Sequence, residues 1–204
     1  RAADTKPFFL TASFTHPHNP FTISKEYWNR YKHEDIDMPS VGNINFEDKD
    51  PWSQRYYHLI RQDEHNLTDN IIRVARHAYY GMISYIDDQV GKIIEALDNT
   101  GLRKNTIVVF TSDHGDMVGE RGMWYKFNPF EWSVKVPLII SSPDGVRGHK
   151  EERGVSLLDL FPTLLNLATD GKPIEVIDPV DGHSLVSLLH NDDQSWEDDV
   201  MMEY

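Results

Sequence analysis

Cysteine is absent from the 204-residue sequence, which excludes disulfide bonds, thiolate metal sites and a cysteine nucleophile within it. Basic residues are few: 20 Lys and Arg stand against 33 Asp and Glu, for a formal net charge of -13. Nucleic-acid-binding proteins need a basic surface, so that class is excluded. Because no apolar run approaches the roughly 20 residues that cross a bilayer, we expect neither nucleic acid nor membrane as a partner.

Both ends of the sequence indicate that the chain is a segment from the interior of a longer protein. The sequence begins without Met and enters an apolar run, Pro7–Phe14, after six residues. It stops where apolar side chains return, at 200–202. We therefore expect a missing N-terminal part of the same protein as a partner.

Apolar stretches separated by polar segments predict an α/β fold. Side chains from Met82 to Leu97 form one helical stripe, and Gly101 follows where a left-handed cap is needed. The β-branched run 106–112 is typical of a strand buried on both faces of a parallel sheet. The remaining expected elements are strands at 7–14 and 136–141, a helix at 156–168 with Pro162 in its first turn, and a helical turn at 185–189.

The chain 1–204 divides into three parts by composition. Residues 22–69 are rich in Pro, Asn, Asp and aromatics without a clean period, which favours a substrate-facing insertion. Residues 70–170 carry the predicted core helix–strand units, and 171–204 begin a C-terminal region.

Side chains that could bind ligands or take part in catalysis follow two of the predicted strands. Ligands bind at this position in open α/β sheets. Asp113 and His114 follow one strand and are plausible metal ligands, although a solvated turn has the same sequence. His18 follows the first strand and could act as a general acid or contact an anion, or could be structural. Lys126 ends a glycine-punctuated loop and could reach an oxyanion, or be an ordinary solvated lysine.

Together, five ordered motifs resemble the sulfatases of the alkaline phosphatase superfamily. They are THPHNPF at 15–21, YIDD at 85–88, TSDHG at 111–115, Lys126, and VSLLDLFPT at 155–163. Within the family, the first motif and SDHGDMVGERGMWYK (112–126) are closest to the choline sulfatase branch; phosphonate monoester hydrolases share much of this frame. The resemblance implies an α/β sandwich with a central, mainly parallel sheet flanked by helices, of which this chain is the C-terminal portion.

The resemblance also implies roles for individual residues. Asp113 and His114 match two ligands of a single divalent cation, Ca²⁺ or Mg²⁺. His18 matches the histidine that protonates the leaving alcohol, and Lys126 the lysine that contacts the sulfate; His16 matches no catalytic position and is treated as structural. The family nucleophile is a formylglycine made from Cys or Ser in a C/S-x-P-x-R motif. This sequence lacks that motif, so the nucleophile is expected in the missing N-terminal part.

The implied function is that of a sulfuric ester hydrolase acting on a small sulfate ester, choline sulfate or a related alkyl or aryl ester. A trimethylammonium group needs an aromatic or acidic pocket, for which the candidates are Trp28, Trp124, Tyr125 and Glu203. The alternatives are a phosphonate monoester or phosphodiester hydrolase, and a non-catalytic sulfatase-like fragment. The same resemblance favours a cytoplasmic location and leaves a homo-oligomer open.

Overall fold

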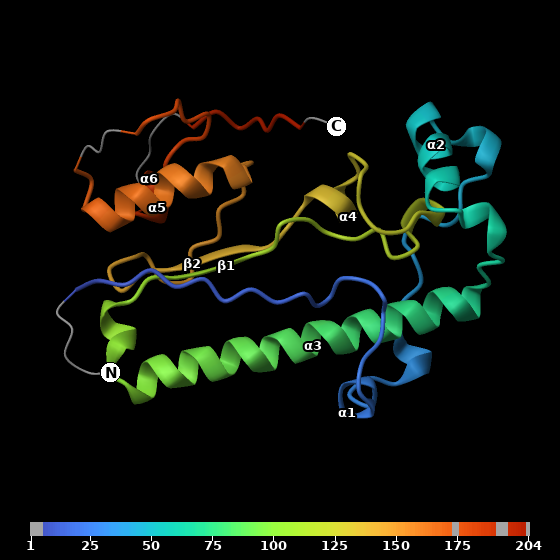
Figure 1. Cartoon of the computed structure of the whole chain (residues 1–204), viewed down its shortest axis with the longest axis horizontal. Helices are drawn as coiled ribbons and strands as arrows, with labels where there is room; N and C mark the ends of the chain where they lie inside the picture. Colours follow the sequence, from blue (N-terminus) through green and yellow to red (C-terminus); the bar gives the residue numbers. More distant parts are fainter. Residues whose placement is uncertain (1–5, 173–175, 191–195, 203–204) are drawn as a thin grey trace.

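The computed structural model describes residues 6–172, 176–190 and 196–202, arranged as layers along one long helix (Figure 1). This helix, α3 (Asp69–Asn99), lies on one side of the strands β1 (Val108–Thr111) and β2 (Leu138–Ser141). Helices α5 (Leu160–Thr169) and α6 (Val186–Leu189) lie on the other side. No helix in the described ranges is long and apolar enough to cross a membrane.

The sheet within the described residues has two strands, and they run antiparallel. Val108 pairs with Ser141 and Thr111 with Leu138. Both predicted strands are confirmed, but the expectation that 106–112 is a strand of a parallel sheet buried on both faces is not met here, because its described neighbour β2 is antiparallel. All four residues of β1 are only half-buried and Ile139 of β2 is exposed, because the described chain covers these strands incompletely.

The predicted strand at 7–14 is wrong within the described structure. The segment is extended but belongs to no ladder, and Phe8, Phe9 and Leu10 are exposed. A strand needs a neighbouring strand for its N–H and C=O groups, and no described segment supplies one here. Extended backbone with apolar side chains is therefore insufficient for a strand at this position.

The predicted helices are confirmed, with different limits. Helix α3 begins well before the predicted stripe, at an N-cap where the Thr68 hydroxyl accepts a hydrogen bond from the Ile71 amide. It ends before Gly101, which has a φ of 72°, as a left-handed cap requires. Pro162 is the third residue of α5, where the missing N–H costs no helical hydrogen bond.

Short helices interrupt the long polar segment 22–69. They are α1 (Lys25–Trp28), η1 (His33–Asp35), η2 (Phe46–Asp48), α2 (Pro51–Leu59) and η3 (Gln62–Glu64). The other short elements are η4 (Leu102–Asn105), η5 (Glu120–Gly122), α4 (Glu131–Val134) and η6 (Leu157–Asp159).

Ion pairs and hydrogen bonds fasten the segment 22–69 to α3. Asp88 of α3 accepts hydrogen bonds from Tyr27 at 3.0 Å and from Arg30 at 2.7 Å. Asp37 in turn accepts from Arg76 and Tyr80 of α3. Partial burial raises the pKa of Asp37, but the Tyr80 and Arg76 hydrogen bonds and the Arg76 charge outweigh it. The pKa therefore lies below its ordinary value of 3.8.

We predict that Asp37→Asn lowers the free energy of unfolding at pH 7 by less than about 1 kcal/mol, since the carboxylate is half exposed. A lowered folded-state pKa means that the contribution exists above the unfolded value of 3.8 and is lost as the pH falls through the folded value. Urea titrations from pH 7 to pH 2.5 should show the two proteins converging in acid. Asp87→Asn, at an exposed aspartate of α3, is the matched control. A difference that persists at pH 2.5 would contradict the assignment.

Candidate active site

Asp113 and His114 lie immediately beyond the end of β1, on a turn that orients both side chains. The His114 Nδ1 atom is 2.7 Å from the Gly115 carbonyl oxygen and must donate to it, because a carbonyl oxygen only accepts. The other ring nitrogen, Nε2, then carries a lone pair and lies 3.6 Å from Asp113 Oδ2. A nitrogen lone pair beside a carboxylate oxygen suits a divalent cation, with the Nδ1 hydrogen bond fixing the tautomer.

The protonation state of Asp113 also suits a cation. Burial raises the pKa of its carboxyl, but the nearby His114 and hydrogen bonds from the His114 amide and Ser112 outweigh this, so the pKa is lowered. The side chain is 84% exposed and open to a ligand. Within the described ranges, no cluster of three or more His, Asp or Glu side chains could hold a metal. Asp113 and His114 could therefore supply two ligands, with the others coming from elsewhere.

Lys126 and His18, which are 108 positions apart in the sequence, meet in the structure. The Lys126 ammonium donates to His18 Nε2 over 3.0 Å, while His18 Nδ1 donates to the Asn19 carbonyl oxygen over 2.7 Å. His18 is therefore held as the neutral tautomer with its Nε2 lone pair toward Lys126. Its ring centroid is 6.3 Å from that of His114, so the pair lies beside the candidate cation ligands. The structure thus brings together four of the predicted site residues.

A half-buried carboxylate, Asp116, shapes the loop between these two parts of the site. One oxygen, Oδ1, accepts from the amides of Val118 at 2.9 Å and Tyr125 at 3.1 Å. Burial raises the pKa of Asp116, and these amides together with His114 and His18 oppose the rise without cancelling it. The loop is closed further by Met117 and Tyr125, whose backbone groups bond over 2.9 Å. Asp116 thereby fixes how far Lys126 lies from Asp113 and His114.

Aromatic packing holds the His18 segment against this loop. Three aromatic rings surround Phe21. The distance from its ring centroid is 6.2 Å to that of Trp124, 6.3 Å to that of Tyr125 and 5.9 Å to that of Tyr79. Burial and the charge of Asp116 raise the pKa of Tyr79 to about 12, so its phenol stays neutral. Trp124 is only 7% exposed. The structure therefore gives Trp124 and Tyr125 a packing role, and substrate contact by either stays a prediction.

The remaining two predicted substrate residues are not brought to the site by any described contact. Trp28 stacks on His77, with ring centroids 3.6 Å apart, and on His33, between α1 and α3. Neither histidine belongs to the site. Glu203 lies outside the described residues.

Sequence reasoning assigned no role to Asp116 or Phe21, although both stand inside motifs that it used. The signal for Asp116 was its place in a tetrapeptide with a second acid, Asp113-His114-Gly115-Asp116. Its charge helps to raise the pKa of Tyr56 and of Tyr79, which come from distant segments. No local pattern reveals such a contact.

We predict that Gly115→Ala disrupts the Asp113–His114 turn. The Gly115 amide donates to the Ser133 carbonyl over 2.7 Å, and an added Cβ would lie 2.1 Å from the Trp132 carbonyl oxygen. Since backbone must shift, we expect a loss of at least about 2 kcal/mol in the free energy of unfolding. Gly91→Ala on α3 is the control, because a Cβ there meets nothing within 4 Å; it should be neutral or stabilising. Equal effects of the two substitutions in denaturant titrations would refute this packing argument.

Comparisons with known proteins agree on one family. The family model described as "Sulfatase" matches residues 1–170. A choline-sulfatase of Rhizobium meliloti (strain 1021) is 40% identical over 200 residues, covering 98% of this chain and 38% of the relative. An arylsulfatase of Clostridium perfringens (strain 13 / Type A) is 36% identical over 207 residues, covering 97% of this chain and 40% of the relative. The chain thus spans about two-fifths of the length of the curated relatives it matches.

The solved structure of the phosphonate monoester hydrolase of Agrobacterium radiobacter superposes with a TM-score of 0.79 at 30% identity. The match covers 96% of this chain and 41% of that one. The predicted fold class, an α/β alkaline phosphatase-like fold present in part, is confirmed by such neighbours. The family match over more than half the chain confirms the resemblance read from the motifs. The chain belongs to the sulfatase family.

Proposed function

We propose that the protein containing this chain hydrolyses sulfate esters to an alcohol and sulfate. The observation that carries the proposal is the Lys126–His18 pair, 3.0 Å apart, beside Asp113 and His114 on a chain of the sulfatase family. A sulfate ester carries negative charge on its sulfate oxygens, and a poor leaving group such as an alkyl alcohol needs a proton delivered to its departing oxygen. The ammonium, the imidazole and the candidate cation ligands suit these two needs.

Lys126 orients the ester and His18 handles the proton in this proposal. The Lys126 ammonium leaves His18 Nε2 and contacts the sulfate and leaving-group oxygens, where negative charge develops. Once the ammonium has moved away, His18 Nε2 takes up a proton from solvent and gives it to the departing alkoxide, which leaves the ring neutral again, while its Nδ1 bond to Asn19 keeps the ring in position. Asp113 and His114 would hold a Ca²⁺ or Mg²⁺ ion, which supplies Lewis-acid stabilisation of charge on the sulfate.

The nucleophile belongs to a part of the protein outside this chain. The proposal assigns it to a formylglycine on an N-terminal part that also provides further metal ligands. A Cys-free sequence without a C/S-x-P-x-R motif supports this assignment. A cytoplasmic location and a homo-oligomer belong to the same proposal and rest on resemblance alone.

Choline sulfate is the first ester to test, because a relative named choline-sulfatase is 40% identical to this chain. The second candidate is a phosphonate monoester or phosphodiester, which the match to a phosphonate monoester hydrolase favours. Sulfate and phosphonate esters carry similar tetrahedral groups, so fold likeness alone does not separate them. A sulfatase-like protein without turnover is the non-catalytic alternative.

The full-length protein should be assayed with choline sulfate, 4-nitrophenyl sulfate and the 4-nitrophenyl ester of phenylphosphonate. We expect the largest kcat/KM for a sulfate ester, loss of turnover after chelation, and recovery on adding Ca²⁺ or Mg²⁺. Faster turnover of the phosphonate would favour the second candidate. No turnover of any ester by metal-loaded protein would favour the non-catalytic alternative.

Substitutions should separate cation binding from charge stabilisation. We predict that Asp113→Ala and His114→Ala lower metal occupancy and activity together. Lys126→Ala should keep the metal and slow turnover by about tenfold to a hundredfold, because it removes an electrostatic stabiliser. Metal content by atomic emission and kcat with 4-nitrophenyl sulfate are the measurements. Full activity of Lys126→Ala would remove its assigned role.

His18→Ala tests the proton step in the same assay series. Its loss of rate should be greater for choline sulfate, a poor leaving group, than for 4-nitrophenyl sulfate, which departs without a proton. Equal losses on both esters would leave His18 with a positioning role only.

A further inference from the structure

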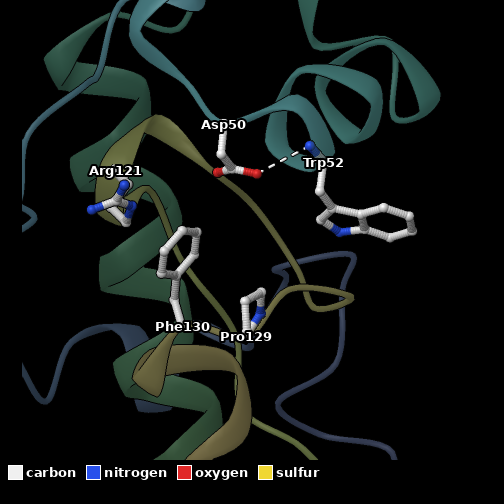
Figure 2. Close-up of a pocket in the computed structure, with 5 residues that line it drawn as sticks. All are labelled: Asp50, Trp52, Arg121, Pro129 and Phe130. Carbon is white, nitrogen blue, oxygen red and sulfur yellow. Dashed lines mark hydrogen bonds between the residues drawn. The ribbon is translucent and has the colours of Figure 1, made fainter. Parts of the chain in front are cut away.

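A hollow of about 520 Å³ opens between the start of α2 and the segment that follows Lys126. Its lining residues are Asp50, Trp52, Arg121, Pro129 and Phe130. Figure 2 shows Arg121 and Trp52 on opposite sides of the view, with Phe130 and Pro129 between them. One wall is thus cationic, and the others are largely aromatic or apolar.

Backbone hydrogen bonds hold Arg121 in place, while its guanidinium has no hydrogen-bond acceptor among the described residues. Its amide donates to the Val41 carbonyl and its carbonyl accepts from Lys49 Nζ, each over 2.8 Å. Its φ of 57° is left-handed, which is unusual for a side chain of this size. The guanidinium carbon lies 4.1 Å from the Phe130 ring centroid, and Nε is buried without a hydrogen-bond partner. Across the described part of the chain, no carboxylate forms an ion pair with it.

The other charged residue that lines the hollow, Asp50, already accepts hydrogen bonds from its own helix. Asp50 Oδ1 accepts from the amides of Trp52 and Ser53, and Oδ2 accepts from the Ser53 hydroxyl, so this carboxylate caps α2. Lys49 does not line the hollow and donates to the Arg121 carbonyl. Among the described residues that line the hollow, Arg121 is the one cation, and its Nε has no hydrogen-bond partner. A planar guanidinium with open N–H groups suits a carboxylate or sulfate.

The aromatic and apolar residues that line the hollow favour a ligand with a flat, apolar group. Trp52 is fixed by an indole hydrogen bond to the Phe127 carbonyl, 2.7 Å long, and 42% of the residue remains exposed. Phe130 already stacks under the guanidinium. A trimethylammonium group entering here could contact Trp52 but would be repelled by the Arg121 charge. The hollow therefore favours an anion over choline.

The hollow also lies near the catalytic pair. Lys126 is followed directly by Phe127, whose carbonyl holds Trp52, and four residues of chain span at most about 14 Å to Phe130. We propose that the hollow receives the organic part of the sulfate ester and that Arg121 binds a second anionic group on it. This rests on the proposed function, and it selects anionic aryl or alkyl esters over choline sulfate. Arg121 is then a specificity-determining residue.

Binding to the site can be measured without turnover. Calorimetry on the full-length protein should show that biphenyl-4-carboxylate binds at least about tenfold more tightly than biphenyl-4-carboxamide. Arg121→Gln should abolish that preference, and Arg121→Lys should keep part of it. Arg55→Gln, at an exposed arginine of α2 outside the hollow, is the matched control and should change nothing.

Trp52→Leu keeps the proposal testable if the Arg121 variants misfold, because it changes an aromatic lining residue and keeps Arg121. Both probes should bind it more weakly while the carboxylate preference remains. Unchanged affinity for both probes would overturn the site, as would equal affinity of the two probes for wild type. Failure of the carboxylate probe to bind wild type, as when another carboxylate of the protein occupies Arg121, would overturn it too.

Kinetics test the substrate role. We expect kcat/KM for 4-sulfooxybenzoate, or for its longer biphenyl analogue, to exceed that for the matching carboxamide by about tenfold. The carboxamide is the better leaving group, so such a preference cannot come from chemistry at sulfur. Arg121→Gln should reduce the ratio toward one, whereas Arg55→Gln should leave the ratio unchanged. Turnover of carboxamide and carboxylate esters at equal rates would overturn the substrate role, whereas failure of every ester would instead count against the proposed function.

Discussion

A single carboxylate oxygen, on the half-buried side chain of Asp116, organises the candidate site. Asp116 Oδ1 accepts hydrogen bonds from the amides of Val118 and Tyr125, which closes the chain between the candidate cation ligands and Lys126 into a compact loop. Burying that carboxylate is costly, as the raised pKa of Asp116 indicates, and two amide donors offset part of the cost. Together with the Met117–Tyr125 backbone hydrogen bond, this closure holds Lys126 at a defined distance from Asp113 and His114.

Packing around that loop joins three distant parts of the chain. Phe21 packs against Trp124 and Tyr125, and this contact fixes the position of the His18 segment relative to the loop. On the other side, Glu120 is 3% exposed and accepts from Ser40 and Val41, which ties the insertion to the loop. The same contacts place Arg121 over Phe130. The Lys126–His18 pair and the neighbouring hollow therefore depend on the same packed loop.

Local patterns predicted the helices well. The apolar stripe of α3, its glycine cap at 101 and the position of Pro162 each express a backbone preference that depends on near neighbours. Sheet pairing was predicted poorly, because a strand is defined by a partner that the sequence does not identify. Residues 7–14 have the composition of a strand and remain unpaired in the described structure, and β1 and β2 are antiparallel where a parallel pair was expected.

The sequence by itself determined which chemical groups are available: an Asp-His pair after a strand, a histidine in a proline-rich turn, a lysine closing a glycine-punctuated loop, and no cysteine. Only the tertiary structure decided how they meet. The 3.0 Å contact of Lys126 with His18 crosses 108 positions, and it depends on the burial of Asp116 and the packing of Phe21. Which lone pair of His114 faces Asp113, and which arginine is left without an acceptor, are likewise set by contacts in space. Hydrogen bonds and packing join residues by distance, and a linear pattern encodes distance only over a few positions.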